Sequence, residues 1–338
     1  IMDKNITRRN WLKKSFFCFL ASIAGSKKIS GNFNNISSSP YPDKKYNIYW
    51  GDLHNHNSVG YAKGSLKRTF EIAKSHLDFF AFTPHSQWHD MPLMEENKHL
   101  KWVNGFKKTR NRWGEVQKMF AEYNKPGEFI TFPGYEWHSS FYGDYCIIFP
   151  YDYPPLKIFK DLKPLQEFAL QEGAILIPHH PGYKQGHRGA NFKFLDPEVS
   201  PVLEIYSEHG NAERDNAPFG YIRHSMGGCW TKNTFQYALA SGYRLGVVAS
   251  TDDHLGYPGA YGEGLVGVLA EELSRKSIFD AIKKRRTYGV TGDRIKLDFR
   301  LNQHFTGEEI PFTTDRDIYI KVSGRDKIER VELLKNNK

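Results

Sequence analysis

The chain has 338 residues, 39% of them hydrophobic and 15% aromatic, so it can bury a large core. Its net charge of +9 lies mostly at the start, because residues 1–30 hold seven basic residues and one acidic residue. The remaining excess does not predict a nucleic-acid groove. The three cysteines, Cys18, Cys146 and Cys229, form no Cys-x-x-Cys pair, which argues against a zinc finger and a disulfide framework.

The first 30 residues have the pattern of an export signal. Arg8-Arg9 precedes the apolar run 16–24, an arrangement that resembles a twin-arginine signal. The run is too short for a stable membrane span. We expect an export signal over 1–30, a flexible tether over 31–46, and a periplasmic or extracellular mature protein. A basic start to a cytosolic helix is the alternative interpretation.

Predicted strands and helices then alternate. Continuous apolar runs predict buried strands, and helical spacing predicts the segments between them. In chain order we expect a strand at 48–50, a helix at 64–76, a strand at 77–82, a long helix to about 123, strands at 128–132 and 145–149, a helix at 162–172, strands at 174–177 and 202–206, a helix at 231–240, strands at 245–249 and 265–270, and a helix at 274–285. This order predicts an α/β fold over 47–292, with a parallel sheet covered on both faces.

The pattern changes near the C-terminus. Residues 296–301 and 317–322 are predicted strands without a helix between them, and 331–334 has strand pattern again. We therefore expect a small β-rich appendage over 293–338, incomplete at its end.

Residue types that bind metals follow the predicted strands. They are Asp52, His54 and His56, then His85, Glu136, His179 and His180, and finally Asp252 and His254. The C-terminal ends of parallel barrel strands meet at one mouth, so these side chains are expected to gather there. The spacing His54-x-His56 places both rings on one side of an extended backbone. The group predicts a metal centre, whereas a structural role is expected for His76, His89, His99, His138, His187, His224 and His304.

Five segments resemble, in order, the motifs of the PHP (polymerase and histidinol phosphatase) superfamily, and especially an exported branch of it. They are residues 51–58, 77–85 and 133–136, His179-His180-Pro181, and Asp252-x-His254. Thr83-Pro84-His85 stands where the family usually has Thr-Asp-His, and no histidine follows His56 closely. The resemblance implies a distorted (β/α)7 TIM-like barrel with a small C-terminal β appendage. It also implies phosphoester hydrolysis by a metal-bound hydroxide at a di- or trinuclear site of zinc, manganese or iron.

The same resemblance implies residue roles. One ion would be held by His54, His56, Glu136 and Asp252, and a second by His85 with Glu136 as the bridge. A further ion or the substrate phosphate would meet His209 and His254, and His180 matches the family's ligand before proline. Asp252 or His254 would carry the catalytic proton. The residues expected to support the ligands or contact a small, phosphorylated substrate are Asp52, His179, Lys184, Arg188 and Glu204.

Two other functions remain open from the residues alone. The same ions could open an amide, a lactone or another ester, as in amidohydrolases, although no lysine follows a predicted strand to bridge them. The chain could instead bind a metal or ligand without catalysis, which would require a closed coordination sphere.

Overall fold

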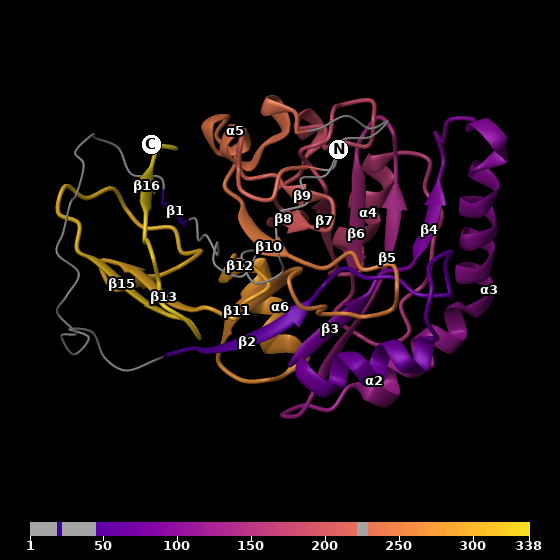
Figure 1. The fold of residues 1–338 in the computed structure, drawn as a ribbon, viewed down its shortest axis with the longest axis horizontal. Coiled ribbons are helices and arrows are strands. Elements are labelled where there is room, and N and C mark those ends of the chain that lie inside the picture. Colours follow the sequence, from indigo (N-terminus) through magenta and orange to yellow (C-terminus); the bar gives the residue numbers. More distant parts are fainter. Residues whose placement is uncertain (1–18, 22–44, 222–228) are drawn as a thin grey trace, which may run out of the picture.

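A computed structural model describes residues 19–21, 45–221 and 229–338 (Figure 1). The predicted export signal and tether therefore lie almost entirely outside the described residues. The backbone of β1 (Phe19–Ala21) is described and pairs in parallel with β16 (Leu333–Lys335). Within the described ranges, none of the helices has the length and apolar character that a membrane span requires.

The centre of the molecule is a curled, mixed sheet of eight strands. In spatial order it holds β12 (Thr287–Thr291), β11 (Gly264–Ala270), β2 (Asn47–Asp52), β3 (Phe79–Phe82), β5 (Ile130–His138), β6 (Asp144–Ile148) and β7 (Ile175–His179), and β4 (His85–Trp88) extends beside β5. The neighbours β2, β3 and β5 are parallel, whereas β6 and β11 run antiparallel to the strands beside them. The prediction of a wholly parallel sheet was therefore wrong.

A smaller sheet continues the curve. It holds β10 (Gly246–Ala249) parallel to β8 (Val202–Ser207), with β9 (Gly210–Asn211) antiparallel to β8. β8 contacts β7 and β10 contacts β12, so the two sheets follow one another around a shared interior. The described architecture is thus a mixed α/β fold rather than a regular (β/α)7 alternation.

The helices are fewer than a regular alternation requires. The described residues contain α2 (Leu66–His76), α3 (His99–Tyr123), α4 (Leu162–Gln171), α5 (Phe235–Ala240) and α6 (Arg275–Lys283), besides short 3-10 turns at Glu95–Asn97, Phe192–Phe194 and Thr231–Asn233. The helix predicted over 231–240 is thus a 3-10 turn followed by α5, which Thr234 caps at Tyr237 N. β5 connects to β6 without a helix, whereas α4 lies between β6 and β7.

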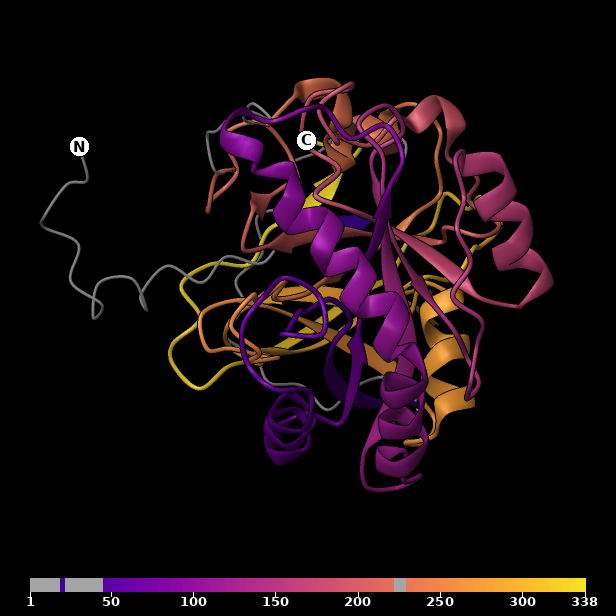
Figure 2. The same ribbon diagram turned by 90° about the vertical axis from the view of Figure 1, so that its right-hand side faces the viewer.

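Local sequence explains why α2 and α3 form where they do. Ser65 Oγ accepts a hydrogen bond from Arg68 N and so caps α2, whose Leu66, Phe70 and Ala73 are buried. α3 runs unbroken through Gly105, where a Cβ would lie 3.1 Å from the Tyr61 backbone nitrogen. The glycine lets α3 approach the loop that carries Tyr61, and α3 crosses the face nearest the viewer in Figure 2.

The predicted C-terminal strands are present. β13 (Lys296–Leu301) pairs with β14 (His304–Phe305) and with β15 (Ile318–Ser323), and both pairings are antiparallel. Figure 1 shows this sheet at the end of the molecule opposite α3.

Candidate metal centre

The longest strand of the curled sheet brings His85 and Glu136 together. β5 pairs first with β3, up to Phe82 opposite Pro133, and then with β4, where His85 stands opposite Glu136. The prediction that this strand ends before Pro133 was wrong, because β4 supplies a new partner where β3 ends. Glu136 therefore lies within a strand, and His85 Nε2 lies 3.3 Å from its Oε2.

Asp52 joins the two loops that carry the His-x-His and Asp-x-His pairs. Its carboxylate accepts hydrogen bonds from His54 N, from Thr251 Oγ1 at 2.6 Å, and from Gly259 N at 2.9 Å. Burial raises its pKa to about 6, against the opposing effect of these donors. Asp52 thus fixes the loops and does not face the cluster interior.

Nitrogen and oxygen atoms of His54, His56, Glu136 and Asp252 converge on one buried point. His56 Nε2 lies 3.1 Å from His54 Nε2 and 2.8 Å from Asp252 Oδ1. Glu136 Oε2 lies 3.5 Å from the Nε2 atoms of both histidines. The structure therefore brings together the four residues predicted to hold the first ion.

The donor set fits a divalent cation. Both oxygens of Glu136 and Oδ2 of Asp252 are buried, and none of the described residues makes a well-aligned hydrogen bond to them, although imidazole nitrogens lie within 3.5 Å. Buried carboxylate oxygens seldom remain without a donor. Convergent lone pairs of imidazole and carboxylate are instead the coordination environment that zinc, manganese and iron accept.

A carboxylate behind the cluster orients two of its histidines. Glu204 lies 3.0 Å from His54 Nδ1 and 2.6 Å from His179 Nδ1, so the Nε2 atoms of both rings face Asp252, each at 3.3 Å. Burial alone raises the pKa of Glu204, but His179 and His54 outweigh it and lower the pKa to about 2. Such a carboxylate fixes the tautomer and increases the basicity of a ligating histidine.

The remaining predicted ligands complete two more groups around these atoms. His179, His180 and His209 offer nitrogens within 4.8 Å of one another, and so do His56, His85 and His254. His209 Nε2 lies 3.0 Å from Asp252 Oδ2. Asp252 therefore stands between the first group and the group around His209.

Burial keeps two of these histidines neutral. It lowers the pKa of His56 to about 3, together with the charge of His254, and it lowers the pKa of His85 well below the usual range. A neutral imidazole retains the lone pair that a metal ion requires.

Sequence reasoning missed His138 and Asp144. His138 Nδ1 lies 3.4 Å from Glu136 Oε1 and 2.8 Å from Asp144 Oδ2, and His138 forms a potential ligand group with His85 and Glu136. Asp144 Oδ2 also accepts a hydrogen bond from Arg188 Nε at 2.7 Å and lies 3.3 Å from His180 Nε2. His138 shares a strand face with Glu136 two residues away, so an extended strand would have revealed it.

Two predicted substrate cations lie in different places. The Arg188 guanidinium is buried, is paired with Asp144, and stacks near Trp88 and Trp102, with its Cζ 4.9 and 5.2 Å from the ring centroids. Lys184 is exposed, and its Nζ lies 5.7 Å from the Trp230 ring centroid. The structure therefore brings Arg188 to the cluster and leaves Lys184 at the surface.

His254 and His209 lie at the mouth of the cluster. Their side chains are 26% and 16% exposed, whereas those of His54, His56 and His85 are at most 2% exposed. His254 Nδ1 lies 3.1 Å from Glu208 Oε1, and its Nε2 lies 3.1 Å from Tyr61 Oη. These two histidines are thus the most exposed of the cluster.

Three residues of the site have left-handed backbone conformations, with φ of +55° at Asp252, +30° at His180 and +69° at Arg188. Such a conformation costs of order 1–3 kcal/mol for a residue with a side chain and is concentrated at functional sites. The contacts around these three residues therefore stabilise backbone conformations that are unfavourable by themselves.

Comparison with known proteins gives partial matches. The model of the family described as "Protein of unknown function (DUF3604)" matches residues 259–317, a segment that begins in the loop before β11 and ends just before β15. An uncharacterised protein of Chlamydia trachomatis is 28% identical over 246 residues, which are 65% of this chain and 39% of that protein. An uncharacterised protein of Chlamydia pneumoniae is 24% identical over 329 residues, 88% of this chain and 48% of that protein. The chain thus spans less than half the length of these curated relatives.

Solved structures with some similarity include a two-domain protein from Bacteroides vulgatus described as containing a predicted PHP-like metal-dependent phosphoesterase. That protein is 16% identical, with a TM-score of 0.47 over 89% of this chain and 92% of its own. Another is Endonuclease Q in complex with a 27-mer duplex that carries an abasic lesion. It is 15% identical, with a TM-score of 0.38 over 70% of this chain and 56% of its own.

Proposed function

We propose that this chain is a metal-dependent hydrolase of the PHP type that cleaves phosphoesters. The observation that carries the proposal is the convergence of Glu136 Oε2, which has no hydrogen-bond partner among the described residues, and of Asp252 Oδ1 with the Nε2 atoms of His54 and His56. The group is buried and its most exposed histidines are His209 and His254, so it has the form of a reaction site that a small molecule would approach past these two side chains.

Two or three ions of zinc, manganese or iron would occupy this site. His54, His56, Glu136 and Asp252 would hold the first. His85 and Glu136 would hold the second, with His138 as a further ligand that the geometry favours. His179, His180 and His209 would hold a third. When bound, such ions lower the pKa of a coordinated water and neutralise charge on phosphoryl oxygens.

Other residues of the chain would position the ligands and transfer the proton. Glu204 holds the rings of His54 and His179 in register, and Asp144 does the same for His138. His254, between Glu208 and Tyr61 at the mouth, is placed to pass a proton at Nε2 between the site and solvent. Asp252, at the centre, is the alternative proton carrier.

The proposed substrate is a small phosphorylated molecule. Tyr61 and Trp102 stand beside His85, with ring centroids 4.3 and 4.9 Å from it, and could contact an organic group. The export signal at 1–30, and hence a location outside the cytoplasmic membrane, remains part of the proposal.

Metal content together with hydrolysis tests this function. The purified chain would be measured for zinc, manganese and iron and then assayed on aryl phosphate mono- and diesters with each metal added. We expect about two or three ions per chain and turnover that His56→Ala abolishes, whereas His76→Ala, on the exposed end of α2, keeps both. Bound metal with turnover of aryl amides or lactones alone would favour the amidohydrolase-like alternative. Metal without any turnover would favour a binding protein, and absence of metal would overturn the proposal.

A further inference from the structure

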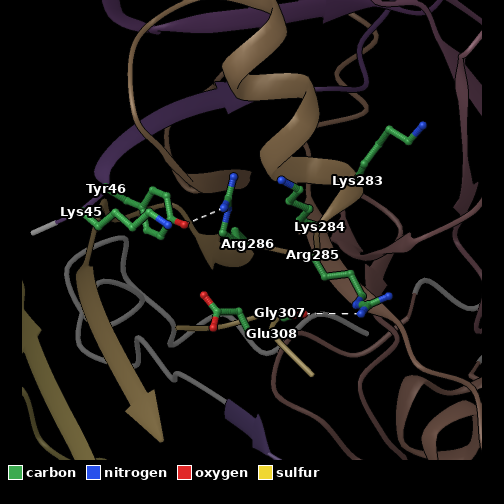
Figure 3. A pocket seen from close by; sticks show the side chains of 8 residues that line it. All are labelled: Lys45, Tyr46, Lys283, Lys284, Arg285, Arg286, Gly307 and Glu308. Carbon is green, nitrogen blue, oxygen red and sulfur yellow. Dashed lines mark hydrogen bonds between the residues drawn. The ribbon is translucent and has the colours of Figure 1, made fainter. Parts of the chain in front are cut away.

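A basic pocket lies outside the metal centre, at the junction with the C-terminal sheet. Its volume is about 390 Å³, and Figure 3 shows the residues that line it, which are Lys45, Tyr46, Lys283, Lys284, Arg285, Arg286, Gly307 and Glu308. Five of these side chains are cations and one is a carboxylate. They come from the two residues before β2, from the end of α6 and its connection to β12, and from the loop after β14.

The backbone gives this pocket a fixed wall. Gly307 has φ of +89°, and a Cβ there would lie 2.4 Å from Lys284 O, so the two loops pack backbone against backbone. Arg285 has φ of +59°, a left-handed conformation that is uncommon for a residue with a side chain. Arg285 Nη2 donates to Glu309 Oε1 at 2.9 Å, and thus this arginine ties the loops together.

The environment of Arg286 is the observation that indicates a ligand in this pocket. It is 8% exposed, its guanidinium carbon lies 4.3 Å from the Tyr46 ring centroid, and its Nη1 donates to Tyr46 Oη at 2.7 Å. Its Nε is buried and has no hydrogen-bond partner in the part of the chain that the structure describes. Lys283 and Lys284 are placed to balance the C-terminal end of α6, but Arg286 lies beyond the helix and has no such role. Buried hydrogen-bond donors are nearly always paired with an acceptor, so a bound anion would supply the one that is missing here.

Glu308 does not neutralise the cations that line the pocket. Its Oε2 lies 2.8 Å from His304 Nδ1, so this carboxylate is directed in part toward the β14 side. The cations of the pocket therefore exceed its acceptors.

We propose that this pocket binds a single phosphate-type group, with Arg286 and Lys284 as the main contacts. A planar guanidinium matches the oxygens of a phosphate, and an ammonium group adds charge without directional demands. The volume is ample for one such group and a substituent. The site is separate from the metal centre and does not depend on the proposed reaction.

Calorimetric titration of the full chain with inorganic phosphate tests this site. Lys284→Gln should weaken binding about fivefold, and Glu308→Gln should strengthen it about fivefold, as expected for one charge near the ligand. Arg286→Lys should weaken it further. Lys163→Gln, an exposed charge on α4, is the matched control and should change nothing.

Two further samples identify the source of the phosphate. Flotation with phosphatidylcholine vesicles, with and without phosphatidylglycerol, shows whether a lipid headgroup binds. The proposal is supported if inorganic phosphate or the vesicles bind and if the same pocket variants weaken that binding. Phosphate binding that Glu136→Gln removes and pocket variants leave unchanged would place the anion at the metal centre and overturn the proposal. Absence of binding to both probes would also overturn it.

Discussion

His85 and Glu136 stand opposite one another on the parallel strands β4 and β5, with His85 Nε2 3.3 Å from Glu136 Oε2. The same carboxylate oxygen lies 3.5 Å from the Nε2 atoms of His54 and His56. Glu136 is therefore the residue through which the first and second ligand groups meet.

Glu136→Gln should lower metal affinity by more than about 100-fold and remove hydrolytic turnover. The amide keeps the shape but loses the negative charge that offsets two nearby cations. Outer partners of metal ligands typically contribute 10–100-fold, and a bridging ligand should exceed that. Competition with a metal-sensitive dye gives the affinity.

The control for this variant is Glu128→Gln, which removes an exposed carboxylate just before the same strand. It should bind metal like the parent chain. Unchanged metal affinity in Glu136→Gln would contradict the bridging role.

Glu204→Gln should weaken metal binding about 10- to 100-fold, with turnover restored by excess metal. The reason is that Glu204 touches only the Nδ1 side of His54 and His179 and so positions them. Turnover measured against metal concentration separates affinity from maximal rate. Exposed Glu198 supplies the control Glu198→Gln. A lower maximal rate at saturating metal would show that Glu204 does more than position the rings.

Much of the fold could be predicted from apolar runs, but strand direction could not. The runs at 145–149 and 265–270 correspond to β6 and β11, yet both strands are antiparallel to their neighbours. A buried antiparallel strand between two layers has the same continuous apolar pattern as a parallel one. Direction is set by the short β5–β6 connection and by distant pairing, which local pattern does not contain.

The site residues that follow a spacing rule in the sequence could be predicted. Those that are brought together only by the pairing of distant strands could not. His54-x-His56 and Asp252-x-His254 show their geometry in the sequence. His138 was overlooked because Pro133-Gly134 suggested a strand end, whereas β4 continues the pairing. Asp144 begins β6 and meets His138 only through the hairpin, so nothing in its neighbourhood marked it.

The buried pair of Asp144 and Arg188 should show strong coupling in a double-mutant cycle. Arg188→Met leaves a buried carboxylate without its main cation, a change that typically costs about 3–5 kcal/mol of unfolding free energy. Adding Asp144→Asn should recover a large part of the loss, because the unpaired charge is gone. Urea unfolding in a chelator measures each chain. Simple additivity of the two single changes would show that the pair contributes no coupling.

Glu263 should make the chelated chain less stable as pH rises. Burial, and then the charges of Asp253, Glu208 and Asp52, raise its pKa to about 8, from 4.5 in an unfolded chain. Between these values the folded state holds a proton that the unfolded state has released, so the free energy of unfolding falls as pH increases.

Glu263→Gln should remove this part of the pH dependence. The variant and the parent chain should have similar stability near pH 4.5, and the variant should be increasingly the more stable toward pH 8. Urea unfolding at several pH values in a chelator provides the comparison. Glu271→Gln, an exposed carboxylate after β11, should follow the parent curve. Parallel curves for Glu263→Gln and the parent would show that Glu263 is ionised in the folded chain, with its charge compensated by groups around it.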